Sequence, residues 1–396
     1  MKMQQKQWLR MATDMSWSIL PGMLLLRSIR NFSKCLTDYK EKQLKGNKIF
    51  LIDGRFLESM ATGVDRYAFE TIKELDRICG DAGFEVRLLV PDTVKSEHAD
   101  TAAVVDAFSN IRVYYVKRGS RWTQVTFALH AWKMGAVPVN LCNEVSVMAP
   151  KGIVCLHDTC YADCPEFFPE DEVKWFLGIY RRIAKKAEVI LTVSEFSKKR
   201  IEEVLGVSAD RIVVAGNGWQ HFEKIQPNEY IFDRLKGVEK GNYYFTLSSA
   251  NKNKNAEWII SASQCNPDAE FVMAGRKLDR VIEFSKYPNV HYAGAVTDEE
   301  AKALMMHCRA FVFPSWYEGF GIPPLEAMSA GARVIVSDRA SLPEVFGRSA
   351  HYIQPDNPVV HFESLLNEPV QSSDEILKKY SWVRTAQTVM QTLASF

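Results

Sequence analysis

The sequence has almost no net charge, no long apolar run and no Gly-x-Gly-x-x-Gly motif. Its 49 basic and 48 acidic residues give a formal net charge of +1, which excludes a strong overall attraction to nucleic acid. The apolar stretch at residues 17–26 is too short and too broken to span a bilayer. Because no dinucleotide fingerprint follows a strand-like segment, a nicotinamide-dependent dehydrogenase is disfavoured.

Paired Cys-x-x-Cys spacings are also missing among the eight cysteines. Cys155, Cys160 and Cys164 cluster around His157 and Asp163, which are residue types that can hold zinc. The intervals do not form paired knuckles, and no second Cys/His cluster completes four ligands. We therefore predict no metal site and interpret the cysteines as free thiols in a reducing cytoplasm.

The first 48 residues form a basic extension, with ten lysines and arginines against three acidic residues. No small-residue cleavage site follows the apolar stretch at residues 17–26, so we predict no signal peptide. Cations that flank an apolar stretch suit a segment lying on the inner face of the cytoplasmic membrane. A loosely packed extension is the equal alternative. Both interpretations predict a cytoplasmic protein.

From Lys48 onward, strand-like and helix-like segments alternate, which predicts α/β domains with parallel sheets. A chain of 396 residues is too long for one hydrophobic core, so we expect two domains, with the boundary between about residues 220 and 241. A helix is expected from about Tyr67 to Cys79, and a last helix at residues 381–393. The expected strands are 49–53, 85–90, 111–116, 136–139, 152–156, 189–193 and 211–214, then 243–247, 269–273, 290–292, 310–312 and 333–336.

The densest motif lies at residues 313–331, where a strand-like segment leads through a loop into a helix. Gly319 and Gly321 in the loop remove side chains where a ligand approaches the backbone. The free N–H groups and the positive dipole end of the following helix suit a diphosphate. Ligands of open α/β sheets bind beyond the carboxyl ends of the strands, so this loop is the candidate binding site.

The helix of this motif has its own start and stop signals. Pro323 and Pro324 pre-set φ for the first turn, and Gly331 is a candidate left-handed cap at the end. Glu318 precedes the loop, and Glu326 is expected in the first turn of the helix. A first-turn glutamate stabilises a helix by about 0.3–1 kcal/mol without any ligand. The combination at fixed offsets nevertheless favours a functional interpretation.

With these residues the chain resembles glycosyltransferase family 4, the group 1 enzymes with the E-x7-E motif, from about Ile49 to the C-terminus. The matching stretches outside the Glu318 loop are residues 63–67 (Gly-Val-Asp-Arg-Tyr), 155–158 (Cys-Leu-His-Asp), 165–168 (Pro-Glu-Phe-Phe), 193–197 (Val-Ser-Glu-Phe-Ser), 217–218 (Asn-Gly), 341–345 (Ser-Leu-Pro-Glu-Val) and 380–382 (Tyr-Ser-Trp).

The resemblance implies a GT-B fold, in which two tandem Rossmann-like parallel-sheet domains face each other across a cleft. It assigns residues 1–48 to an extension, 49–225 to the acceptor-binding domain, 240–380 to the nucleotide-sugar-binding domain and 381–396 to a C-terminal helix that returns toward the first domain. It assigns Glu318 to the sugar hydroxyls near the reacting carbon and Glu326 to the ribose hydroxyls. Further donor contacts are implied for Gly319, Phe320, Gly321, Leu342, Glu344 and Gly63.

The chain contains no Asp-x-Asp motif, the device with which GT-A transferases hold a divalent metal. Fixed cations and N–H groups must then stabilise the departing diphosphate. The resemblance places Lys254 on the family's phosphate lysine, in a loop that also contains Lys252 and Asn255 as donor-binding candidates. Asn253 stands where the family usually has arginine, which leaves open whether Lys252 replaces that cation.

Two further candidates belong to the first domain. His157 ends a buried-type strand, and at the family's His-Asp position it is expected to touch the donor sugar as a catalytic-site residue. Arg66 follows the Gly63 loop and could meet the donor phosphate or the acceptor. We predict neither a metal nor a cofactor, because the nucleotide-sugar is a substrate.

The predicted function is transfer of a hexosyl unit, with retention of configuration, to a saccharide or lipid-linked saccharide acceptor in surface polysaccharide synthesis. GDP-mannose is the first expectation for the donor, with UDP- and dTDP-sugars as alternatives. A GT-B nucleotide-sugar epimerase, a phosphorylase and a non-catalytic nucleotide-sugar-binding relative remain open as alternative functions. A phosphorylase would need a pyridoxal lysine context, which we do not find.

Overall fold

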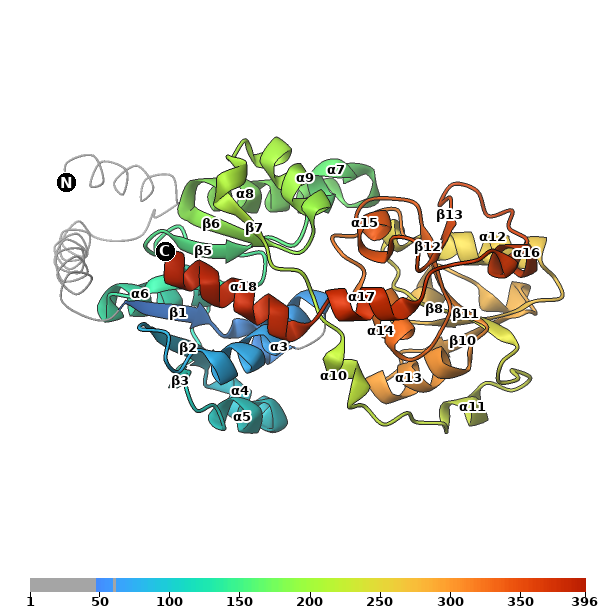
Figure 1. The fold of residues 1–396 in the computed structure, drawn as a ribbon, viewed down its shortest axis with the longest axis horizontal. Coiled ribbons are helices and arrows are strands. Elements are labelled where there is room, and N and C mark those ends of the chain that lie inside the picture. Colours follow the sequence, from blue (N-terminus) through green and yellow to red (C-terminus); the bar gives the residue numbers. More distant parts are fainter. Residues whose placement is uncertain (1–47, 60–61) are drawn as a thin grey trace.

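The computed structural model describes residues 48–59 and 62–396 and contains two β-sheets in tandem (Figure 1). The predicted basic extension therefore lies, apart from Lys48, outside the described residues. Every strand pairing in both sheets is parallel. The predicted class of two Rossmann-like parallel-sheet domains is thus confirmed.

The first sheet has seven strands in the order β3-β2-β1-β4-β5-β6-β7. Phe50 and Ile52 of β1 face one layer of helices, whereas Leu51 between them faces the other, as the alternation of side chains along a strand requires. The strands are β1 (Ile49–Asp53), β2 (Glu85–Pro91), β3 (Arg112–Val116), β4 (Val137–Asn140), β5 (Gly152–Cys155), β6 (Ala187–Thr192) and β7 (Ile212–Val214).

The second sheet has six strands in the order β10-β9-β8-β11-β12-β13. In each sheet the strand order reverses once, between β1 and β4 and between β8 and β11, and ligands of such sheets bind beyond the strand ends at this point. The strands are β8 (Tyr243–Leu247), β9 (Glu270–Ala274), β10 (Val290–Gly294), β11 (Ala310–Phe313), β12 (Val334–Ser337) and β13 (His351–Ile353). Strand β13 was not predicted.

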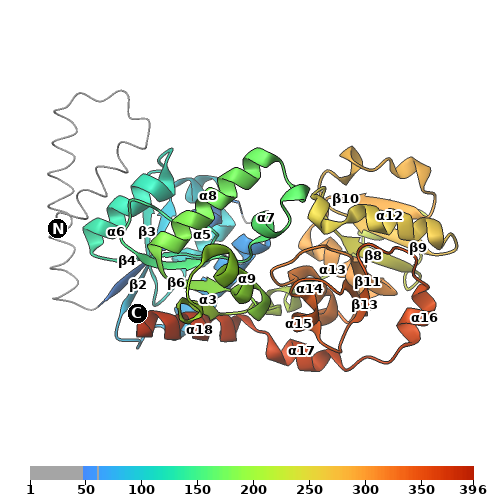
Figure 2. The ribbon, with the colours of Figure 1, turned by 90° about the horizontal axis from the view of Figure 1, so that it is seen from above.

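Helices cover both faces of the first sheet (Figure 2). One face packs against α3, α4 and α5, and the other against α6, α8 and α9. The helical segments of this part are η1 (Arg55–Glu58), α3 (Gly63–Ile78), α4 (Thr93–Glu97), α5 (Ala99–Asp106), η2 (Trp122–Phe127), α6 (Ala128–Met134), α7 (Cys160–Asp163), η3 (Pro165–Phe167), α8 (Glu170–Lys186), α9 (Glu195–Leu205) and η4 (Ala209–Arg211).

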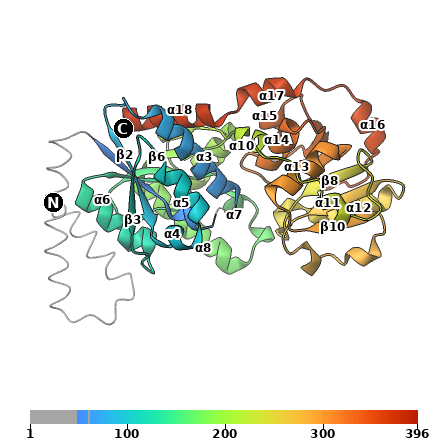
Figure 3. The same ribbon diagram turned by 90° about the horizontal axis from the view of Figure 1, so that it is seen from below.

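The last helix, α18 (Trp382–Ser395), lies along α3 of the first domain (Figure 3). Its buried residues join the core of the first sheet, which confirms the predicted return of the C-terminal helix; they include Trp382, Ala386, Val389 and Leu393. The other helical segments after β7 are α10 (Gln220–Glu223), α11 (Ile231–Arg234), η5 (Lys252–Lys254), α12 (Ala256–Cys265), η6 (Leu278–Arg280), η7 (Phe284–Lys286), α13 (Asp298–His307), α14 (Ile322–Ser329), α15 (Leu342–Phe346), α16 (Phe362–Asn367) and α17 (Ser373–Lys379).

Helix α3 begins at Gly63, four residues before the predicted start at Tyr67. Thr62 caps it, because the Thr62 hydroxyl accepts from the N–H of Asp65 while the Asp65 carboxylate accepts from the N–H of Thr62. Arg66 therefore lies in the first turn of the helix and not beyond a loop. Within residues 48–59 and 62–396, no helix combines the length and apolarity needed to cross a membrane.

Candidate functional site

An ion pair between Lys254 and Glu318 lies where the strand order of the second sheet reverses. Lys254 ends η5, which follows β8, and Glu318 lies in the loop that follows β11. The Lys254 ammonium donates to both carboxylate oxygens of Glu318, at 2.7 and 2.9 Å. Burial lowers the pKa of Lys254, but the negative charge of Glu318 raises that pKa above its ordinary value. Lys254 is therefore a cation at neutral pH.

The rest of the Lys254 loop holds this lysine in place. Asn255 adopts the left-handed conformation (φ 56°), and its amide donates to the carbonyls of Pro314 at 3.0 Å and Pro355 at 2.8 Å. The carbonyl of Asn253 accepts from the Trp316 N–H, so the loop after β8 is tied to the loop after β11. Lys252 is exposed on the outside of this turn, and the structure does not bring it to the ion pair.

His157 is buried in the segment that follows β5 of the first domain. Its Nε2 lies 3.0 Å from the carbonyl oxygen of Leu141, to which it must donate. Its ring packs edge-on against Tyr67, with 4.7 Å between the two ring centroids. Burial lowers the pKa of His157 to about 4, so the imidazole is neutral at neutral pH. A neutral ring with the proton on Nε2 keeps only Nδ1 as an acceptor.

Asp158 is a charged group near the ion pair that the sequence interpretation left without a role. Its carboxylate accepts from the N–H of Cys160 at 2.9 Å. Burial raises the pKa of Asp158, the charge of Glu318 raises it further, and Lys254 lowers it. The sequence did contain a signal for Asp158, because it follows His157 in the stretch at residues 155–158 that matches the family.

At both glycines of the Glu318 loop, protein atoms lie close to the position that a Cβ would occupy. A Cβ on Gly319 would lie 2.7 Å from the carbonyl oxygen of His157. The Gly319 carbonyl accepts from the hydroxyl of Ser194 at 2.7 Å, so this loop touches the first domain directly. Gly321 has φ 101° and begins α14, and a Cβ there would lie 2.8 Å from the Leu342 side chain.

We expect Gly319→Ala to lower both the stability and the transfer rate. The added methyl overlaps a backbone oxygen that cannot rotate away, which costs about 1–3 kcal/mol and separates the two domains at this contact. Gly178→Ala in α8 is the matched control, because the nearest atom, on Arg182, is 3.8 Å from its Cβ position. That helix-interior change should stabilise by about 0.5–1 kcal/mol. Urea unfolding and transfer assays of both variants test this, and equal effects would contradict it.

Glu326 is held by a chain of hydrogen bonds that joins the two domains. The Trp382 indole N–H donates to Nδ1 of His221 at 2.9 Å, so the His221 proton is on Nε2, which donates to Glu326 at 2.8 Å. Glu326 is the fifth residue of α14 and not a first-turn residue, which corrects the expected position. Nothing in the sequence singled out His221.

Arg66 bridges from α3 to the second domain. Its guanidinium pairs with Asp298, the first residue of α13. Burial lowers the pKa of Arg66, but Asp298 and then Glu326 raise it. Gly63, the first residue of α3, faces the side chain of Ile322, the first residue of α14. The structure thus places Gly63 and Arg66 at the junction of the two domains.

The α15 segment also contacts the first domain. Phe320 is buried, with its ring centroid 4.9 Å from that of Tyr380 in an edge-on contact, and Leu342 is buried in the same hydrophobic core. The carboxylate of Glu344 accepts from the first two N–H groups of α9, on Glu195 at 2.8 Å and Phe196 at 2.7 Å. Leu342 and Glu344, assigned to the nucleotide, therefore have protein partners, and Glu344 caps a helix of the other domain.

The cysteine cluster has no metal-site geometry. Asp163 accepts from the hydroxyls of Tyr317 at 2.6 Å and Thr159 at 2.7 Å, and it pairs with Arg200. The cysteines of the described ranges are free thiols. No group of three or more His, Cys, Asp or Glu side chains suited to a metal ion occurs among residues 48–59 and 62–396. Tyr317 instead links the Glu318 loop to α7.

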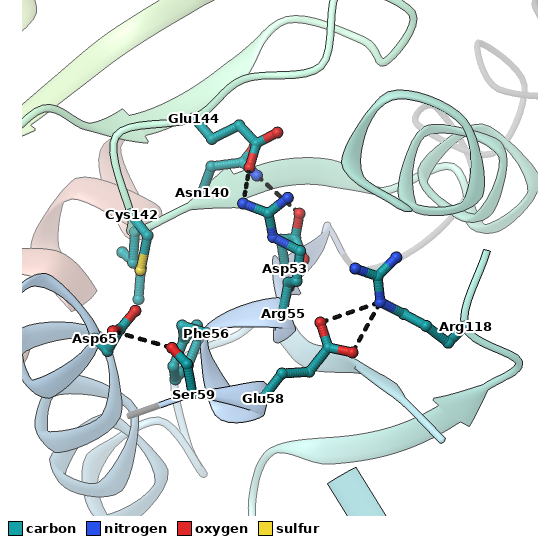
Figure 4. Close-up of a pocket in the computed structure, with 11 residues that line it drawn as sticks. Asp53, Arg55, Phe56, Glu58, Ser59, Asp65, Arg118, Asn140, Cys142 and Glu144 are labelled. Atoms are coloured by element: carbon teal, nitrogen blue, oxygen red, sulfur yellow. Dashed lines mark hydrogen bonds and ion pairs between the residues drawn. The ribbon is translucent and has the colours of Figure 1, made fainter. Parts of the chain in front are cut away.

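A polar cavity lies where the strand order of the first sheet reverses (Figure 4). Asp53, at the end of β1, forms its floor and accepts from Trp122 Nε1 at 2.6 Å, Thr123 at 2.9 Å and Asn140 at 3.2 Å. Burial raises the pKa of Asp53. Sequence reasoning did not single out this cavity, because its lining comes from three separate segments of the chain, within residues 53–65, at 118 and within 140–144.

Two family matches together cover most of the chain. Residues 61–220 match the family described as Glycosyltransferase Family 4, and residues 228–372 match Glycosyl transferases group 1. The chain belongs to glycosyltransferase family 4, whose members have the GT-B fold.

The curated relatives include two O-antigen enzymes. The chain is 30% identical to O-antigen chain mannosyltransferase B of Escherichia coli over 52% of its length and 58% of that protein. It is 28% identical to O-antigen chain mannosyltransferase RfbU of Salmonella typhimurium over 49% of its length and 55% of that protein. The matched segment thus spans little more than half the length of these relatives.

Solved structures show the same fold at lower sequence identity. Anabaena Alr3699/HepE in complex with UDP and glucose aligns with a TM-score of 0.64 at 16% identity, covering 88% of this chain and 100% of that one. Sucrose-phosphate synthase from Thermosynechococcus elongatus aligns with a TM-score of 0.66 at 13% identity, over 88% of this chain and 99% of that one. Both likenesses concern the fold.

Proposed function

We propose that this protein transfers a hexosyl unit from a nucleotide-sugar to a saccharide or lipid-linked saccharide acceptor in surface polysaccharide synthesis. The observation that supports this most strongly is the Lys254–Glu318 pair, a partly buried cation 2.7 Å from a buried carboxylate where the strand order of the second sheet reverses. A nucleotide-sugar presents a diphosphate that needs a cation and sugar hydroxyls that need acceptors. The pair offers both.

In the proposed reaction, the bond between the anomeric carbon and the diphosphate oxygen breaks while the acceptor oxygen bonds to the same carbon. Negative charge grows on the departing diphosphate, where the Lys254 ammonium stabilises it without a divalent metal. Glu318 accepts hydrogen bonds from the donor hydroxyls, and Nδ1 of the neutral His157 offers a further acceptor. Glu326, held by His221, takes the ribose hydroxyls.

We propose that the acceptor attacks from the face that the diphosphate leaves, so that the configuration is retained and the leaving phosphate takes the acceptor proton. A covalent double displacement would need a free carboxylate next to the anomeric carbon. Glu318 is the candidate, but both of its oxygens accept from Lys254. These hydrogen bonds reduce its nucleophilicity, which favours the same-face route.

Mannose is the proposed sugar and GDP-mannose the first donor, because the two O-antigen relatives bear the name mannosyltransferase. UDP-sugars are the second choice, since the Anabaena structure contains UDP and glucose. Purified protein incubated with GDP-mannose, UDP-glucose and a dTDP-sugar, each with and without EDTA, tests the proposal. We expect GDP-mannose to be consumed at an unchanged rate in EDTA. Loss of turnover in EDTA, restored by Mg²⁺ or Mn²⁺, would contradict the metal-independent route.

A further inference from the structure

The cavity beyond β1 and β4 is a built polar site that the donor chemistry does not use. Its floor is the buried carboxylate of Asp53, fixed by the indole, hydroxyl and amide donors described above and by the N–H of Arg55 at 3.1 Å. Burying a carboxylate is costly unless hydrogen bonds compensate it, so this floor is a rigid feature. Other polar side chains of the lining form pairs around it: Arg55 with Glu144, Arg118 with Glu58, and Ser59 with Asp65 (Figure 4).

Both arginines of the cavity are already paired with carboxylates. Arg55 forms an ion pair with Glu144, and the Arg118 Nε lies 2.8 Å from Glu58. The Glu58 carboxylate also accepts from the Thr93 hydroxyl at 2.8 Å. These pairs leave few uncompensated positive charges for an anion. The four acidic lining residues outnumber the two basic ones; the acids are Asp53, Glu58, Asp65 and Glu144.

The cavity lies next to the groups proposed to handle the donor sugar. Leu141 lines the cavity, and its carbonyl accepts the Nε2 proton of His157. The carbonyl of His157 in turn packs against Gly319, the residue that follows Glu318. One buried side chain therefore separates the cavity from the Glu318 loop.

We infer that this cavity receives an uncharged sugar unit of the acceptor and discriminates against uronic acids and phosphorylated sugars. The inference rests on the proposed transferase function and names the chemical class of its acceptor. Paired carboxylates and guanidinium groups offer both acceptors and donors to hydroxyl groups, which suits a neutral polyol. An anion there has to displace Glu144 or Glu58 from its arginine before it can pair with that arginine.

Binding of matched sugar pairs to the full chain tests the inference by saturation-transfer NMR. The probes are the methyl α-glycosides of mannose, glucose and galactose, each compared with its uronate, with excess nucleoside diphosphate present to occupy the donor site. We expect at least one neutral glycoside to bind about tenfold more tightly than its uronate. Wild-type protein that binds uronates equally well, or that binds none of the probes, overturns the inference.

Variants at the Arg55–Glu144 and Arg118–Glu58 pairs test whether this cavity causes the preference for neutral sugars. Glu144→Gln keeps the shape of the side chain but leaves Arg55 without its carboxylate, so the preference should shift toward the uronate by about tenfold. Glu58→Gln should act in the same direction through Arg118. Glu283→Gln, at an exposed pair with Lys286, changes the net charge equally and should leave the preference unaltered. Unchanged preferences in both cavity variants, with thermal melting curves that show them folded, overturn the inference.

Nucleotide-sugar hydrolysis without acceptor separates this inference from the proposed function. If wild type neither binds nor hydrolyses any nucleotide-sugar, the proposed function fails. If donor hydrolysis is normal and the sugar preference is absent, only the acceptor inference fails.

Discussion

Lys254→Met is expected to lower the transfer rate by about a hundredfold to a thousandfold while the protein stays folded. The methionine keeps most of the apolar stem but removes the cation placed to stabilise the departing diphosphate, and losing one such group typically has an effect of this size. The other lysine of this loop, Lys252, is exposed and is not brought to the ion pair, so we expect no replacement for the lost cation. Single-turnover transfer assays give the rate directly.

Two further variants sharpen this test. Lys254→Arg keeps the charge and should retain measurable transfer. Lys286→Met removes a cation from an exposed pair of the same domain and should leave the rate unchanged. Turnover by Lys254→Met at the wild-type rate would contradict the proposed leaving-group role.

Glu318→Gln is expected to lower transfer by about a hundredfold and to separate sugar binding from diphosphate binding. The amide keeps the shape but loses charge-assisted hydrogen bonds to the donor hydroxyls, each worth about 1.5–3 kcal/mol. It also releases Lys254 from its carboxylate partner. The affinity for a free nucleoside diphosphate should therefore stay the same or rise, whereas the affinity for the nucleotide-sugar should fall.

Isothermal titration of the two ligands into wild type, Glu318→Gln and Lys254→Met measures this split. Lys254→Met should lower the affinity for both ligands, because both contain the diphosphate. If Glu318→Gln lowers the affinity for the free nucleoside diphosphate as much as the affinity for the nucleotide-sugar, Glu318 does not act through the sugar.

The two domains are held together by contacts that local sequence patterns do not predict. Ser194 reaches the Gly319 carbonyl, Glu344 caps α9, and His221 holds Glu326. Each pair joins residues more than 100 positions apart. Several residues assigned to the donor by resemblance therefore also hold the domains together, so their substitution will change closure as well as binding.

Local patterns determined much of the fold from the sequence. Buried apolar runs placed β1 at residues 49–53 and β8 at 243–247, because a strand covered on both faces needs consecutive apolar residues. Gly331 was expected as a left-handed cap and has φ +86°. The short strand β13 was missed because three residues give too weak a pattern. The start of α3 was missed because the Thr62–Asp65 capping box was overlooked.

The sequence by itself determined the class of fold, the order of its elements and the residue types at the Lys254 and Glu318 loops. These follow from signals within a few neighbouring residues and from a motif with fixed spacing. Only the tertiary structure decided which residues meet: Gly319 with the backbone of His157, Glu326 with His221, and Arg55 with Glu144. Such contacts depend on strand order, helix rotation and domain placement, which are set by packing over the whole chain and leave no local trace in the sequence.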